Sequence, residues 1–248
     1  MARYFIELSY HGSAFAGWQR QPGQETVQGA LEHVLSAKLR RPIEVTGCGR
    51  TDTGVHATQY YCHFDTETAL SPEFMWEANN FLPAGIALKR IFPVHPEAHA
   101  RFDAVRRAYT YHLHTQKNPF QGGASFYFAA ARDLTPADLQ PAAELLLGYD
   151  HFFPFCKSDH DAQTLRCELM GSEWLYLGDG NWEYHIAANR FLRGMVRLIV
   201  GMCLNVALGK LPLEAVRHAL DTQQRLPRDW SVPPEGLFLS EVRYDFVD

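Results

Sequence analysis

The segment 47–57, with the sequence GCGRTDTGVHA, places an arginine and an aspartate two positions apart on a glycine-rich turn. In an extended chain, the side chains of Arg50 and Asp52 project to the same side. A neighbouring guanidinium favours the ionised form of a carboxyl group. The glycines allow a sharp bend and the close approach of a ligand. We therefore predict that Asp52 is a reactive carboxylate with the role of a nucleophile.

Three other interpretations apply to the same segment. Asp and Thr side chains hydrogen-bond to nearby backbone in turns, so a purely structural role for residues 51–54 is one of them. The first glycines begin like a dinucleotide-binding fingerprint, but Asp52 occupies the third glycine position and no helical pattern follows. Asp-Thr-Gly is also the tripeptide of aspartic proteases, which need two carboxylates that share a proton. The sequence contains one copy, so a protease would have to be a homodimer.

A second group of candidate residues lies in the apolar segment 191–208, which has the spacing of a long helix. At 100° per residue, Arg190, Arg193 and Arg197 fall within a stripe of about 60°. Gly194 and Gly201 lie beside this stripe, where they leave room for a partner, and no acidic residue occurs between positions 190 and 210. We predict a cationic face that binds a partner; the alternative is an ordinary solvated face.

A third group follows from the alternating pattern of residues 106–114, which predicts a strand. Arg107, Tyr109 and Tyr111 then share one face. A tyrosine beside an arginine can stack on a nucleobase or take part in proton transfer, whereas a buried core tyrosine is the alternative. Two further cationic candidates are Arg101, just before this strand, and Arg20, in the glycine-rich loop 11–24.

The composition sets limits on these interpretations. With 46% hydrophobic and 21% charged residues, the 248-residue chain has the balance of a globular protein. No apolar stretch follows a basic start, so no signal peptide is predicted. Arg193 and Arg197 interrupt the longest apolar region, which disfavours a membrane span. Five cysteines without a C-x-x-C pair argue against a zinc site and a disulfide framework, and indicate a reducing cytoplasm.

The net charge of −5 bears on nucleic-acid binding, which usually requires a basic domain. Any such role must rest on a local concentration of arginine and lysine, balanced by acidic surface elsewhere. The twelve histidines are scattered and lack the H-x-x-x-H spacing of a helical metal site, so no metal is predicted.

The elements that must position these residues alternate irregularly between strands and helices. We predict an α+β fold of two similar halves, 1–100 and 101–248, with mainly antiparallel sheets that combine into one central sheet. Helices would lie on its outer side, with a catalytic cleft between the halves. The predicted strands are 3–10, 43–46, 55–64, 86–94, 106–114, 169–177, 182–188 and 237–244, and the predicted helices are 26–41, 71–79, 135–147, 191–208 and 213–220; residues 157–165 are predicted to form a loop.

Taken together, the motifs resemble the tRNA pseudouridine synthase A family. The central block GRTDTGVHA at 49–57 resembles its signature, although Thr53 replaces a frequent alanine and Cys48 stands where a smaller residue is common. The other family blocks occur in the same order over nearly the whole chain: GWQ at 17–19, TVQG at 26–29, NNFLP at 79–83, ARFDA at 100–104, YTY at 109–111, NRFL at 189–192, MVRLIVG at 195–201 and PEGLFL at 234–239.

This resemblance implies that the chain isomerises uridine to pseudouridine at nucleotides 38, 39 and 40 of the tRNA anticodon stem-loop. Asp52 matches the nucleophile, and Arg50 in the same motif would orient or contact the substrate. Tyr109 matches the tyrosine that stacks on the target base, Arg197 the arginine that pairs with the catalytic carboxylate, and Leu237 an apolar residue of the pocket. The family also implies a homodimer whose tRNA contacts both subunits, and no cofactor or metal.

The reaction itself leaves several routes open. The C1′–N1 bond must break, the uracil must turn, and C5 must bond to C1′. Asp52 could add to C6, attack C1′, or assist removal of a ribose proton. The base must be flipped out of the arm at a cost of about a few kcal/mol, while basic side chains such as Arg190 and Arg193 grip the opened backbone. A tRNA-binding protein without catalysis remains an alternative, which would need the arginines but not Asp52.

Overall fold

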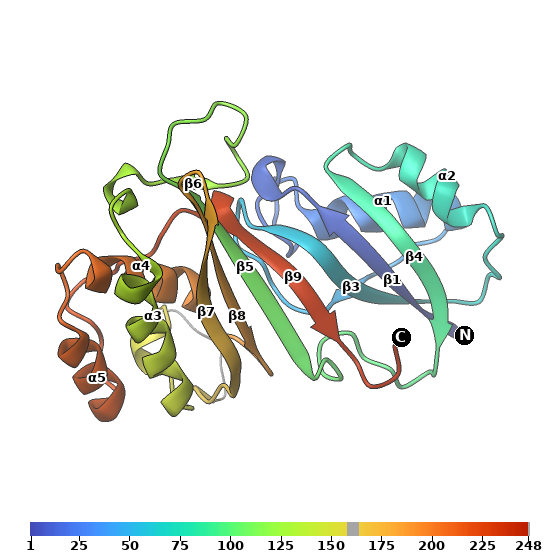
Figure 1. Ribbon diagram of the computed structural model, residues 1–248. Helices are drawn as coiled ribbons and strands as arrows, with labels where there is room; N and C mark the ends of the chain where they lie inside the picture. The colour runs from blue at the N-terminus through green and yellow to red at the C-terminus, as the bar shows by residue number, and fades with distance from the viewer. Residues whose placement is uncertain (158–163, 248) are drawn as a thin grey trace. The chain divides into compact units, whose positions relative to one another are not determined.

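The computed structural model describes residues 1–157 and 164–247 (Figure 1), so most of the predicted loop at 157–165 lies outside the described residues. The chain divides into two compact units: unit 1 comprises residues 1–105 and 238–248, and unit 2 comprises residues 106–237. Each unit combines helices with mainly antiparallel strands. The predicted mixed α+β class with mainly antiparallel strands is confirmed.

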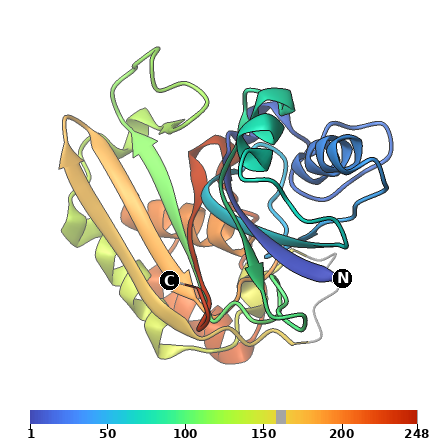
Figure 2. The same cartoon turned by 90° about the vertical axis from the view of Figure 1, so that its right-hand side faces the viewer.

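Unit 1 is organised around strand β1 (Ala2–Tyr10), which pairs antiparallel with β3 (His56–Thr66) on one side and β4 (Ile86–Val94) on the other. The short strand β2 (Thr46–Gly47) also pairs with β3. Strand β9 (Leu237–Arg243) returns from the end of the chain to pair in parallel with the start of β3. Helices α1 (Val27–Leu39) and α2 (Phe74–Phe81) cover one face of these strands (Figure 2).

Unit 2 contains an antiparallel sheet of β5 (Arg106–His114), β8 (Asn181–Ala188) and β7 (Leu169–Gly178), and β6 (Phe126–Tyr127) pairs in parallel with the end of β5. Helix α3 (Pro136–Leu145) packs against β7 and against α4 (Met195–Ala207), and α5 (Leu213–Thr222) follows α4 (Figure 1). Ser172 links the sheet to α3, because its hydroxyl donates to the Ala143 carbonyl and bonds to the Tyr184 hydroxyl.

Local signals explain where two of the predicted helices begin. The Thr26 side chain accepts a hydrogen bond from the backbone N–H of Gly29 at 3.2 Å, so it caps α1 as its sequence position predicts. Thr135 and Asp138 form a reciprocal capping box at the start of α3, and Pro136 occupies the first helical position. Such caps satisfy backbone donors that have no partner within the helix.

The structure contradicts the prediction of an arginine stripe on one long helix. Helix α4 begins only at Met195, because Gly194 adopts a left-handed conformation with φ of 70° at its N-cap. Arg190 and Arg193 therefore precede the helix, and Arg197 is the member that lies on it. The space beside Gly201 is filled by the Trp230 carbonyl, so this glycine serves the close approach of the chain itself and not that of a partner.

Other boundaries differ in smaller ways. Residues 43–45 are not in a strand, and α2 starts at Phe74, three residues after the predicted start. The predicted hairpin around residues 178–180 is confirmed by the pairing of β7 with β8. Within the described ranges 1–157 and 164–247, no helix combines the length and apolar character that a membrane span requires.

A buried histidine ties the loop after β4 to the sheet of unit 1. The Nδ1 atom of His63 accepts a hydrogen bond from the Ala100 N–H at 3.1 Å, which requires that nitrogen to be unprotonated. Burial, reinforced by the charge of Arg3, lowers the pKa of His63 from 6.5 to about 4. The Tyr244 hydroxyl donates to the Ala100 carbonyl at 2.6 Å, so the same residue is held from two sides.

We predict that His63 makes the stability of the fold sensitive to acid. Because its pKa is lower in the folded chain, the unfolded chain binds the proton first as the pH falls below 6.5. The contribution of His63 to the unfolding free energy is therefore complete above about pH 6.5 and is lost as the pH falls towards 4. Between pH 7 and pH 4.5, the wild type should lose on the order of 1–3 kcal/mol more unfolding free energy than His63→Asn, measured by urea denaturation. Equal losses in the two proteins would contradict this assignment.

Candidate functional site

The loop that carries Asp52 is held in place through its neighbour Thr51. The Thr51 side chain bonds to the buried Tyr10 hydroxyl at 2.8 Å, and the Thr51 carbonyl accepts a hydrogen bond from the Trp18 N–H at 3.2 Å. The Val55 N–H donates to the Asp52 carbonyl at 3.1 Å and closes the turn. Asp52 itself is half-buried and Arg50 is exposed. A carboxylate is thus presented on a backbone that is fixed on both sides.

Residues from the loop after β1 pack closely against this turn. Gly12 is buried, and its N–H donates to Nδ1 of His56 at 3.0 Å. A Cβ atom on Gly12 would overlap the Val55 carbonyl, and one on Gly17 would crowd the Thr51 carbonyl. Glycine is thus required at positions 12 and 17 as well as within the motif, where a Cβ on Gly47 would overlap the Tyr60 hydroxyl and Gly54 has a φ of 79°. Sequence reasoning missed Tyr10 and Thr51, because a hydroxyl pair 41 positions apart has no sequence pattern.

The two remaining arginine candidates of unit 1 differ in their surroundings. Arg20 forms an ion pair with the nearly buried Glu32 at 3.1 Å, so part of its charge is balanced within the chain. Arg101 is exposed, and its guanidinium lies over the Phe102 ring at 5.7 Å. Both Arg101 and Phe102 donate their N–H groups to Nδ1 of His99, which fixes the loop that presents them.

In unit 2, the predicted face of β5 divides into a buried and an accessible part. Tyr111 is fully buried and its hydroxyl donates to the Pro233 carbonyl at 2.9 Å. Tyr111 is therefore a core tyrosine, which is the alternative to a role in base stacking or proton transfer. Tyr109 is half-buried, and its ring meets Phe191 edge to face with centroids 5.1 Å apart. Tyr109 therefore offers an aromatic ring whose orientation is fixed by packing.

Arg197 is held by the segment that precedes β9. Its Nε donates to the Val232 carbonyl at 2.7 Å, and the Val232 N–H donates in return to the Arg197 carbonyl at 3.2 Å. Burial raises the pKa of Tyr111, as does the charge of Glu235, whereas the charge of Arg197 acts in the opposite direction. Leu237 is buried and follows directly on the same segment. Unit 2 thus brings Arg197, Tyr111 and Leu237 into one region.

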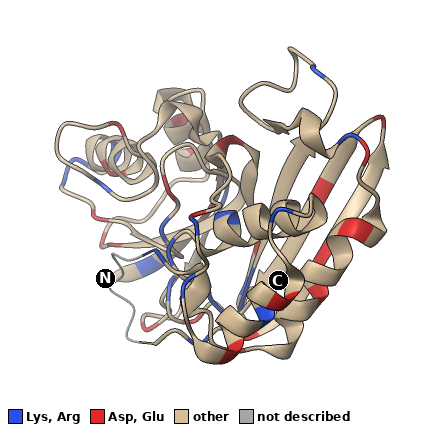
Figure 3. Cartoon of the chain, turned by 90° about the vertical axis from the view of Figure 1, so that its left-hand side faces the viewer, with Lys and Arg blue, Asp and Glu red and all other residues tan. Residues whose placement is uncertain are grey.

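Tertiary contacts also bring together segments of unit 2 that carry four basic residues, which we call the basic cluster: Arg107, Lys157, Arg190 and Arg193. The Lys157 N–H donates to the Arg193 carbonyl at 3.3 Å, and Nη1 of Arg107 donates to the Asn189 carbonyl at 2.9 Å. Burial raises the pKa of the Cys167 thiol to about 11, and the nearby Arg190 opposes this rise. In the view of Figure 3, basic positions (blue) and acidic positions (red) both occur on strands, helices and loops.

The candidate residues are therefore distributed over both units. Within the described part of the chain, no group of three or more His, Cys, Asp or Glu side chains is arranged to hold a metal ion. Unit 1 carries Arg20, Arg50, Asp52 and Arg101, and unit 2 carries Tyr109, Arg190, Arg193, Arg197 and Leu237.

We predict that Gly12→Ala destabilises unit 1, because the added methyl group would displace the Val55 carbonyl beside the Asp52 turn. The loss should be about 1–3 kcal/mol in unfolding free energy, measured by urea denaturation. Gly49→Ala is the matched control, since a Cβ there meets no atom within 4 Å. This control should be neutral or slightly stabilising. Equal effects of the two substitutions would show that the close approach at Gly12 is unimportant.

Comparison with known proteins supports one family. A family model described as tRNA pseudouridine synthase matches residues 142–245. The tRNA pseudouridine synthase A of Parabacteroides distasonis is 41% identical over 246 residues, which cover 98% of this chain and 96% of that protein. The enzymes of the same name from Bacteroides thetaiotaomicron and Bacillus subtilis are 41% and 35% identical, and cover 98% and 96% of this chain and 91% and 97% of their own lengths. This chain therefore belongs to the tRNA pseudouridine synthase A family.

Proposed function

We propose that this protein is an isomerase that converts uridine to pseudouridine in tRNA, at positions 38, 39 and 40 of the anticodon stem-loop. The observation that carries the proposal is the similarity, over 96–98% of the chain, to relatives named tRNA pseudouridine synthase A. The resemblance of residues 49–57 to the family's signature supports the assignment of the reacting group to Asp52.

In the proposed reaction, the uracil leaves C1′ through N1, turns while it stays bound, and forms a new bond from C5 to C1′. The proton on C5 is released to solvent and N1 gains a proton, so the product is an isomer of the substrate. Asp52 acts as the nucleophile on C6 or C1′, or assists removal of a ribose proton. Each route requires a carboxylate at a defined position, which the anchoring of Thr51 by Tyr10 and Trp18 favours.

We propose that three residues of unit 2 act on the same uridine as Asp52. The Tyr109 ring stacks on the uracil, and Leu237 provides an apolar wall that limits where the free base can turn. Arg197 pairs with the Asp52 carboxylate and orients it. The hydrogen bond from Nε of Arg197 to the Val232 carbonyl supports this role, because it restricts the position of the guanidinium.

Binding of the tRNA would rest on local positive charge. A flipped nucleotide costs about a few kcal/mol in lost stacking and pairing. In our proposal, the basic cluster together with Arg20, Arg50 and Arg101 contacts the opened phosphate backbone and offsets this cost. We further propose that the protein acts in the cytoplasm as a homodimer whose tRNA contacts both subunits, as the family resemblance implies.

The first test is the substitution Asp52→Asn, which preserves size and removes the negative charge. Formation of pseudouridine releases the C5 hydrogen, so tRNA labelled with tritium at C5 of uridine reports turnover directly. The wild type should release tritium, and Asp52→Asn should lower the rate roughly 10⁴-fold or more while it still binds tRNA. A wild type that releases no tritium would exclude the synthase and favour the alternative of a tRNA-binding protein. Full activity of Asp52→Asn would remove this residue from the chemistry.

The second test separates a catalytic role of Arg197 from a role in binding. Arg197→Met should lower kcat by roughly 10²- to 10³-fold, because a charged donor beside the reacting groups is lost. The Kd for tRNA should change far less, since several other cations contact the backbone. Arg217→Met is the control, because Arg217 is an exposed residue of α5 paired with Glu214. A proportional fall of rate and affinity would assign Arg197 to backbone binding instead.

A further inference from the structure

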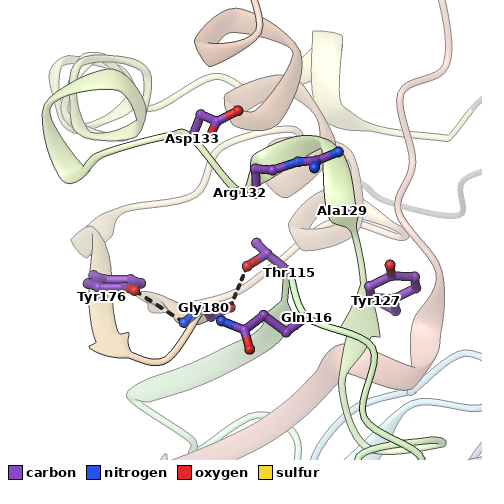
Figure 4. Close-up of a pocket in the computed structure, with 8 residues that line it drawn as sticks. All are labelled: Thr115, Gln116, Tyr127, Ala129, Arg132, Asp133, Tyr176 and Gly180. Atoms are coloured by element: carbon purple, nitrogen blue, oxygen red, sulfur yellow. Dashed lines mark hydrogen bonds between the residues drawn. The ribbon is translucent and has the colours of Figure 1, made fainter.

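Unit 2 contains a pocket that none of the proposed catalytic residues lines (Figure 4). Its volume of about 400 Å³ lies within the range of small-ligand sites. It is formed where three parts of unit 2 meet: the chain after β5, the segment from β6 to residue 133, and the turn between β7 and β8. The lining residues are Thr115, Gln116, Tyr127, Ala129, Arg132, Asp133, Tyr176 and Gly180.

The base of this pocket is rigid. The Gly180 carbonyl accepts hydrogen bonds from the N–H and the hydroxyl of Thr115, at 2.9 and 3.2 Å. The Gly180 N–H donates to the Tyr176 hydroxyl at 3.1 Å (Figure 4). Gly180 has a φ of 74° and a Cβ there would collide with the Thr115 side chain, so the turn requires glycine. The hairpin turn and the end of β5 are therefore locked together.

Two tyrosine rings stand on opposite sides of this base, with Thr115 and Gln116 between them (Figure 4). The Tyr127 ring rests against His114 with centroids 5.5 Å apart, and the Tyr176 ring rests against Trp182 at 4.7 Å. Both tyrosines remain about half exposed, at 46% and 50%. Rings that are fixed in position and still half exposed to solvent are the platforms on which unpaired bases stack.

Polar groups complete the lining. Within residues 1–157 and 164–247, the side chains of Gln116, Arg132 and Asp133 make no hydrogen bond or ion pair with the chain. Their donors and acceptors are therefore available to a ligand. The guanidinium of Arg132 suits a phosphate, the Asp133 carboxylate accepts from amino or hydroxyl groups, and the Gln116 amide does both. Planar rings together with a guanidinium, a carboxylate and an amide match a nucleotide better than an apolar peptide or a lipid chain.

We infer that this pocket binds one unpaired nucleotide of the tRNA, separate from the uridine that reacts. Its base stacks on Tyr127, Arg132 contacts its phosphate, and Gln116 and Asp133 hydrogen-bond its base edge or 2′-hydroxyl. The inference rests on the proposed function, which supplies tRNA as the source of the nucleotide. A free mononucleotide has the same chemistry, so the experiment must distinguish the two sources.

The test uses the whole protein with an unmodified tRNA transcript, by filter binding for Kd and by tritium release for kcat and KM. Tyr127→Ala should raise Kd and KM about fivefold or more and leave kcat unchanged. A fivefold loss of affinity is about the smallest effect expected when one base–aromatic stack is removed. Tyr127→Phe keeps the ring and should bind as the wild type does. Arg132→Ala should reduce the slope of log Kd against log salt by about one, and Arg132→Lys should restore it.

Two control variants test whether any surface change has the same effect. Phe120→Ala removes a 94% exposed aromatic ring outside the pocket, and Arg217→Ala removes an exposed charge on α5. Both should leave Kd unchanged. Unaltered tRNA affinity in Tyr127→Ala and Arg132→Ala, or an equal loss in the controls, would overturn the inference. A second outcome would also overturn the inference: AMP, GMP, CMP or UMP binds the wild type but not Tyr127→Ala and Arg132→Ala, while these two variants keep their tRNA affinity. That result would favour a free nucleotide as the ligand.

The outcome for the pocket can be distinguished from the outcome for the proposed function. A wild type that releases no tritium would remove the synthase assignment, whatever the pocket variants do. A wild type that releases tritium, with pocket variants of normal Kd and KM, would remove the pocket inference alone.

Discussion

The anchoring of Thr51 is the interaction on which the candidate chemistry depends. Its side chain bonds to Tyr10 and its carbonyl accepts a hydrogen bond from Trp18, so the backbone next to Asp52 is fixed from two directions. A reacting carboxylate needs such a fixed position, because small displacements at a catalytic group cost large factors in rate. The strand β1 and the loop that follows it supply this constraint, and Gly12 packs so closely on Val55 that a side chain there would collide with it.

A similar constraint operates in unit 2. The segment 230–236 runs along α4 and β5, where its carbonyl groups accept hydrogen bonds from Arg197 and Tyr111. The Trp230 carbonyl lies so close to α4 that only glycine is possible at position 201. One irregular segment thus fixes an arginine and leads directly into Leu237. The hydrogen bond from Arg197 to this backbone restricts the orientation of a long, flexible side chain.

The distribution of charge explains how an acidic protein can bind RNA in our proposal. The net charge is −5, yet contacts in unit 2 bring Arg107, Lys157, Arg190 and Arg193 together from three parts of the chain. Such a cluster attracts phosphate locally, while the acidic remainder disfavours binding to any nucleic acid without regard to shape. The pocket at Tyr127 and Arg132 would add stacking, which depends on an unpaired base and not on charge alone.

Local patterns in the sequence determined most of the elements and indicated the loop that we propose to be reactive. Thr26 and the capping pair Thr135–Asp138 act over three residues, so their helices could be predicted from the sequence alone. The tertiary structure decided the rest: that α4 begins only after Gly194 and so excludes Arg193, that Tyr111 is core while Tyr109 is half-buried, and that Tyr10 anchors Thr51. These outcomes rest on contacts between segments far apart in the chain, and no local pattern of residue types records such contacts.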